Sequence, residues 1–119
     1  MSEVNPIIDD AALLYDKWRL TLGDALFSKG GDLRWTKNQD VYRALAGLLM
    51  ASGLRQEMVQ LLIDEMVRGV CISMLSILDG ATKMSEEHNL RIKIDGKEID
   101  AGSLHMDFVI YLLETGRMT

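Results

Sequence analysis

Residues 54–80, LRQEMVQLLIDEMVRGVCISMLSILDG, constrain the fold of this chain more than any other stretch. Their first half mixes apolar and charged side chains at helical spacing. Their second half, Val70 to Leu78, is apolar on every side except for two serines. A helix that is apolar all round has to be covered by other elements. The pattern therefore predicts a central core helix over about 55–79, on which the rest of the chain packs.

A first helix is predicted over about 9–27, followed by a break at 28–31 where two glycines adjoin. Asp9 and Asp10 are expected to cap this helix and to suit its positive end. Because Pro6 disfavours helix at Asn5, residues 1–8 are expected to form a flexible terminus. The apolar face of the helix recurs at steps of one, three and four residues: Leu13, Leu14, Trp18, Leu22, Ala25 and Leu26.

A second helix is predicted from near Lys37 to Gly53. Thr36 followed by Gln39 fits a capping box at its start, and Gly53 is placed to be its left-handed stop. Its apolar stripe consists of Val41, Tyr42, Leu45, Leu48 and Leu49.

The solvated side of the core helix is predicted from its polar residues, and Asp64 and Arg68 are expected to pair four residues apart. These polar residues are Glu57, Gln60, Asp64 and Arg68. The methionines at 58, 66 and 74 are interpreted as filler of the hydrophobic core.

After residue 89 the apolar period changes from 3.6 to 2, which predicts a β-hairpin. Asp95-Gly96 between alternating runs is a strong hairpin signal, because both turn residues need positive φ. The expected pairs are Ile94 with Lys97, Ile92 with Ile99, and Leu90 with Ala101. One helical turn is expected before the hairpin, around 85–87.

A last helix is predicted over about 104–115. Ser103 is expected to cap it, and Gly116 to stop it. Its apolar stripe is Leu104, Phe108, Tyr111 and Leu112. The predicted fold is therefore mainly α, with about four helices around the central core helix and one β-hairpin (about 90–100) between the last two helices. At 119 residues the chain is expected to form a single domain, 1–119.

The charge and hydropathy of the chain narrow its function classes. The formal net charge is −5, which argues against nucleic acid as a partner and is compatible with a basic protein. The alternative interpretation is that the acidity only keeps the protein in solution. The longest uncharged apolar run, Gly69 to Leu78, falls short of the roughly 20 residues that a membrane span needs. No secretory signal pattern is found, so a cytoplasmic location is expected.

The chain offers few residues for chemistry. His88 is interpreted as an exposed loop residue. His105 is interpreted as structural or solvent-facing near a helix start, where a general base would need a partner that the sequence does not identify. Cys71 lies in the most apolar part of the core helix and is expected to pack there with a raised pKa. We expect no metal, no cofactor and no catalytic residue.

Residues that could contact a protein partner gather around the hairpin and in one connector. Trp35 lies in the connector and could anchor a partner, since tryptophan is common in interface hot spots. The alternative is that Trp35 folds back over the helix ends. The candidate carboxylates are Glu86, Glu87, Asp95, Glu98 and Asp100. Lysines and arginines are interleaved with them, so an ordinary solvated surface is the alternative here.

The last third of the chain resembles small bacterial toxin-immunity proteins, including those of contact-dependent growth inhibition systems. The resemblance rests on Leu78-Asp79-Gly80, the short hairpin, Leu104-His105-x-x-Phe108-x-x-Tyr111-Leu112 and Gly116-Arg117. The resemblance covers about 40 residues, and it does not assign a functional role to any residue of this chain. It implies a small acidic cytoplasmic protein that blocks a secreted nuclease or another toxin.

Two main hypotheses for function follow from these observations. The first is a non-enzymatic protein-binding inhibitor, in particular an immunity protein that forms a complex with a basic toxin domain. The alternative is a small self-associating structural or regulatory protein that forms a homodimer through its methionine-rich apolar helix. An enzyme that uses His105 with a nearby carboxylate is a third and minor alternative.

Overall fold

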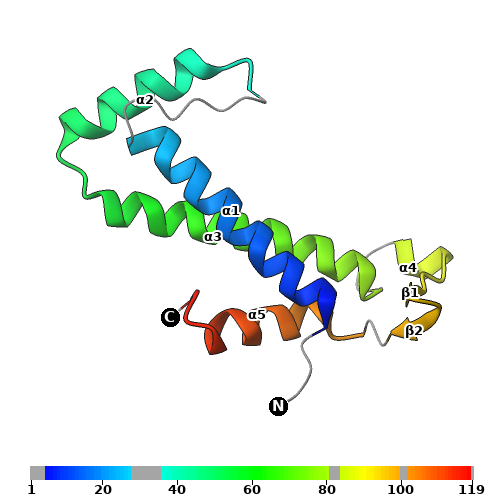
Figure 1. Ribbon diagram of the computed structural model, residues 1–119. Helices are drawn as coiled ribbons and strands as arrows, with labels where there is room; N and C mark the ends of the chain where they lie inside the picture. Colours follow the sequence, from blue (N-terminus) through cyan, green and yellow to red (C-terminus); the bar gives the residue numbers. More distant parts are fainter. Residues whose placement is uncertain (1–4, 28–35, 81–83, 100–101, 119) are drawn as a thin grey trace. The chain divides into compact units, whose positions relative to one another are not determined.

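The computed structural model describes residues 5–27, 36–80, 84–99 and 102–118, and the chain is mainly helical (Figure 1). A two-stranded antiparallel hairpin lies between the third and the last long helix, which confirms the predicted fold class. The elements are α1 (Pro6–Phe27), α2 (Gln39–Ser52), α3 (Gln56–Leu78), α4 (Met84–Glu87), β1 (Ile92–Ile94), β2 (Lys97–Ile99) and α5 (Leu104–Glu114).

The chain divides into two compact units, which are described separately below. Unit 1 comprises Met1–Leu14 and Arg68–Thr119, and unit 2 comprises Tyr15–Val67. The helices α1 and α3 each contribute residues to both units. The expectation of a single domain stays a prediction.

The first helix begins at Pro6, earlier than the sequence analysis placed it. Proline suits the first helical position, because the N–H that it lacks has no partner there anyway. The Asn5 side chain accepts a hydrogen bond from the Ile7 N–H at 2.8 Å, which is the capping role that had been assigned to Asp9 and Asp10. Ile8 is buried. Residues 5–8 therefore do not form a loose terminus, and residues 1–4 lie outside the described residues.

The second helix begins at Gln39, two residues later than expected, and the predicted capping box is not formed. The Thr36 hydroxyl accepts a hydrogen bond from the Asn38 N–H at 3.0 Å, before the helix starts. Gly53 ends the helix in the left-handed conformation, as predicted, with φ of 74°. The third helix and its stop at Gly80 (φ of 73°) also agree with the prediction.

The hairpin has the register that its turn predicts. Ile92 pairs with Ile99 and Ile94 with Lys97. Asp95 and Gly96 both have positive φ, 52° and 78°, as the two-residue turn requires. The three isoleucines are half-buried. The expected pair of Leu90 with Ala101 falls partly outside the described residues.

The core of unit 1 is built on α5, where three of the four residues of the predicted stripe are buried and Tyr111 is half-buried. Leu104, Phe108 and Leu112 are almost completely buried, each one helical turn from the next. Ile8, Ala12 and Leu75 are the buried apolar residues that α1 and α3 add in this unit. On the part of α3 that belongs to unit 1, Val70 and Met74 are 64% and 60% exposed. The expectation that this stretch is covered on every side is therefore wrong.

In unit 2, α3 turns its polar side to α1, so the predicted solvated side is wrong for Gln60 and Asp64. The Gln60 side chain donates to the Arg19 carbonyl oxygen (3.0 Å) and to Asp64 Oδ1 (2.9 Å). The Arg19 guanidinium lies 3.7 Å from the Asp64 carboxylate. The fit is close, because a Cβ at Gly23 would lie 2.0 Å from Gln60 Oε1. Asp64 thus pairs with Arg19, and α3 packs on α1 through hydrogen bonds.

Candidate functional site

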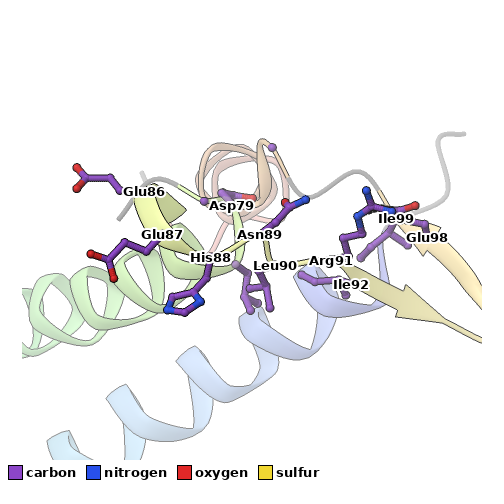
Figure 2. Close-up of a pocket in the computed structure, with 13 residues that line it drawn as sticks. Asp79, Glu86, Glu87, His88, Asn89, Leu90, Arg91, Ile92, Glu98 and Ile99 are labelled. Carbon is purple, nitrogen blue, oxygen red and sulfur yellow. Dashed lines mark ion pairs between the residues drawn. The ribbon is translucent and has the colours of Figure 1, made fainter. Parts of the chain in front are cut away.

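An open pocket of about 800 Å³ in unit 1 is the candidate site (Figure 2). The end of α3, the turn α4 with the segment after it, and the two strands of the hairpin surround it. The lining residues are Leu78, Asp79, Gly80, Glu86, Glu87, His88, Asn89, Leu90, Arg91, Ile92, Glu98, Ile99 and Gly102. The local sequence explains this arrangement, because Gly80 stops α3 and the Asp95-Gly96 turn folds the hairpin back beside α4.

Three of the predicted partner-binding carboxylates line this pocket: Glu86, Glu87 and Glu98. All three are exposed. Figure 2 shows Glu86 and Glu87 on one side of the pocket, and Glu98 beside Arg91 on the other. Arg91 Nε lies 3.7 Å from the Glu98 carboxylate, across the hairpin. The rim therefore offers carboxylates that a cationic side chain could reach from solvent, and one of them has a cation beside it.

The other predicted site residues are not part of this pocket. Asp95 occupies the first turn position of the hairpin and is exposed. Trp35 and Asp100 lie outside the residues that the structure describes. His88 lines the pocket and is exposed, as predicted for a loop histidine.

Asp79 lines the pocket, and sequence reasoning missed its role. Its side chain is 0% exposed. It accepts hydrogen bonds from the backbone N–H groups of Leu104 (2.8 Å) and His105 (2.7 Å). It also contacts the Nδ1 atom of the His105 ring. One buried carboxylate, placed just after α3, therefore caps the amino terminus of α5.

Ser103 had been predicted to provide this cap, and that prediction is wrong. Ser103 occupies the N-cap position without a capping hydrogen bond from its side chain. Its hydroxyl donates instead to the Asp107 carboxylate at 3.0 Å. A sequence signal for Asp79 did exist. A carboxylate beside the negative end of a helix is unfavourable unless a positive group lies nearby, and the amino terminus of α5 is such a group.

The contact with Asp79 supplies the carboxylate partner that the sequence did not identify for His105. The histidine side chain is 28% exposed, and His105 is not among the residues that line the pocket. The described contacts of the pair connect α3 to α5, which is a structural role. A second such connection joins α5 to α1, where the Tyr111 hydroxyl donates to Asp9 Oδ1 at 2.9 Å.

The described residues include no group of three or more His, Cys, Asp or Glu side chains placed to hold a metal ion. No helix in the described part of the chain is long and apolar enough to cross a membrane. Comparisons with protein-family models, with curated proteins and with solved structures found no match for this chain.

Cys71 is half-buried, and burial raises the pKa of its thiol, as predicted, against a smaller opposite effect of a backbone hydrogen bond. We expect iodoacetamide to alkylate Cys71 more slowly in the folded chain than in the chain unfolded by guanidinium, with the rate rising at higher pH. The folded chain keeps the thiol proton to higher pH. The protonated thiol therefore stabilises the folded chain at pH values below the unfolded-state pKa. This contribution is lost as pH rises through the folded-state pKa. Coincident pH profiles for the two states would contradict this expectation.

Proposed function

We propose that the protein is a non-enzymatic, protein-binding inhibitor of the toxin-immunity kind, and that a basic surface of the toxin meets the rim of the unit 1 pocket. The observation that carries the proposal is the exposed set Glu86, Glu87 and Glu98 around one open pocket. A concave acidic surface suits lysine and arginine side chains of a partner. If the toxin is a nuclease, the groups that bind substrate phosphate are of this kind.

The charge of the whole chain supports the same proposal. A net charge of −5 attracts a basic partner from a distance and speeds the encounter. Charges at the rim of an interface act mainly on the association rate and on its salt dependence. The association rate of the proposed complex should therefore fall as salt is added. The fall is expected as the Debye length drops below about 10 Å.

The test uses the full chain and the toxin domain encoded beside it. We expect a complex by gel filtration, and inhibition of the toxin. The triple variant Glu86→Gln, Glu87→Gln, Glu98→Gln should lower the association rate at low salt by about ten-fold or more. A matched control, Asp10→Asn, Asp24→Asn, Glu114→Gln, removes the same three units of charge from exposed positions outside the pocket.

The control separates position from net charge. It should lower the association rate by no more than about three-fold, since its charges act only from a distance. Equal losses in the two triple variants would overturn the assignment of the pocket rim as the binding surface. Failure of the chain to form any complex with the toxin would overturn the inhibitor proposal itself.

A further inference from the structure

The helix α2 differs from the other long helices because it has no buried residue. The helices α1, α3 and α5 each contribute side chains to a core, for example Tyr15, Ile63 and Phe108. All of α2 lies in the described part of the chain, and none of its 14 residues is buried. Exposed apolar side chains alone do not distinguish α2, because every long helix carries some. Met58 and Met66 on α3 are 48% and 64% exposed, and they are not the core filler that was predicted.

One side of α2 is partly covered. Tyr42, Ala46 and Leu49 are half-buried and follow the four- and three-residue spacing of one helix face. Leu48, by contrast, is 66% exposed. Burial stabilises in proportion to the apolar area that is removed from water. The half-covered side of α2 therefore attaches this helix more weakly than the fully buried Phe108 attaches α5.

The helix has little local stabilisation to offset this weak attachment. At 14 residues it has the length at which an isolated helix is marginal in water. Its N-cap residue, Asn38, makes no capping hydrogen bond with its side chain. Gly47 lies inside the helix, where glycine is less favourable than alanine. The ion pair of Asp40 with Arg43, 3.8 Å apart, lies within the helix and is exposed, so water screens it.

The segments that adjoin α2 are exposed as well. Every residue from 50 to 58 is exposed, which includes the turn at Gly53 where the chain reverses into α3 (Figure 1). Lys37 and Asn38, just before the helix, are also exposed. Within the described range 36–62 no residue is buried. The helix can therefore open without uncovering a buried side chain of its own.

We infer that α2 is an order–disorder element, which melts and re-forms while the contact between α1 and α3 in unit 2 stays intact. That contact is made by residues outside α2. Gln60 donates to the Arg19 carbonyl oxygen and to Asp64, and Ile63 on the same side of α3 is buried. Elements with few buried contacts open at the lowest free energy, and elements whose order changes on binding come from this least stable part of a fold. The inference concerns α2 alone and does not depend on the pocket of unit 1.

Hydrogen exchange of the full chain, followed by mass spectrometry of its peptides, measures this opening. The amides of α2 should exchange at least about ten-fold faster than those of α3 at 59–67, after correction for their intrinsic rates. Equal protection of the two segments would overturn the inference, since it would mean that they open together.

A variant of the core separates a local opening of α2 from an opening of the whole unit. Ile63→Val removes one methylene from a buried side chain and should speed exchange at 59–67 about five-fold. The exchange of α2 should not change, because the contact between α1 and α3 is present whether α2 is ordered or melted. An equal acceleration in α2 would overturn the inference.

A variant of α2 itself tests whether the opening is melting of the helix. Gly47→Ala should slow the exchange of α2 about five-fold, because alanine favours the helix and its Cβ would lie in open space. The matched control Gly69→Ala adds a Cβ in open space to α3 and should leave the exchange of α2 unchanged. An unchanged α2 in the Gly47 variant, or equal effects of the two variants on α2, would overturn the inference. Either result leaves the inhibitor proposal standing, since that depends on the toxin complex.

Discussion

Replacing Asp79 with alanine is expected to lower the free energy of unfolding by about 3 kcal/mol. The carboxylate is buried and accepts hydrogen bonds from the N–H groups of Leu104 and His105. Its loss leaves both donors without this partner at the start of α5, and it also removes a negative charge from the positive end of that helix. Urea unfolding followed by circular dichroism measures the loss. Amide hydrogen exchange at Leu104 and His105 should speed up.

The control for this prediction is Ser103→Ala, at the position where the sequence suggested the cap. The Ser103 hydroxyl contacts only the exposed Asp107 carboxylate among the contacts described for it, so its removal should cost less than about 0.5 kcal/mol. Asp79→Asn keeps one acceptor oxygen and should fall between the two. A Ser103 variant as unstable as the Asp79 variant would show that the cap is assigned to the wrong residue.

Phe108→Ala is expected to cost about 4 kcal/mol, because the ring is fully buried and alanine leaves a cavity that its surroundings fill only in part. Leu104 and Leu112 flank the ring one turn away on either side and are buried with it. A chain of this size has on the order of 6–18 kcal/mol of stability in total. The variant should therefore show a large shift of the urea midpoint, measured by circular dichroism.

Ile110→Ala on the same helix is the matched control for Phe108→Ala. Ile110 is 48% exposed, so most of the apolar surface that its truncation removes is in contact with water already. The expected loss is about 1 kcal/mol or less. Similar losses in the two variants would contradict the assignment of the α5 stripe as the centre of the unit 1 core.

Much of the fold could be predicted because it depends on near neighbours in the chain. The hairpin register follows from two turn residues that both adopt positive φ, and the structure confirms it at Asp95 and Gly96. Gly53 and Gly80 end their helices for the same local reason. The start of α1 was wrong by three residues, since Pro6 suits the first helical position as well as it disfavours helix at Asn5.

The candidate site was predicted only in part. Glu86, Glu87 and Glu98 do line one pocket, because α4 and the hairpin are close in the sequence as well as in space. The cap of α5 could not be predicted with a local rule, because Asp79 acts on residues 25 and 26 positions further along the chain. Ser103 satisfied the local rule for a cap and does not provide the capping hydrogen bond.

The sequence by itself determined the types of the elements, their turns and the apolar stripe of α5, since short-range sterics and periodicity decide these features. Only the tertiary structure decided which side of α3 meets α1. The sequence pattern favours burying its leucines and methionines, yet Gln60 and Asp64 face α1, because Arg19 supplies a carbonyl oxygen and a guanidinium for them there. Hydrogen-bond partners far apart in the chain outweigh periodicity at this contact, and Met58, Leu61, Leu62 and Met66 on the other side of α3 stay exposed.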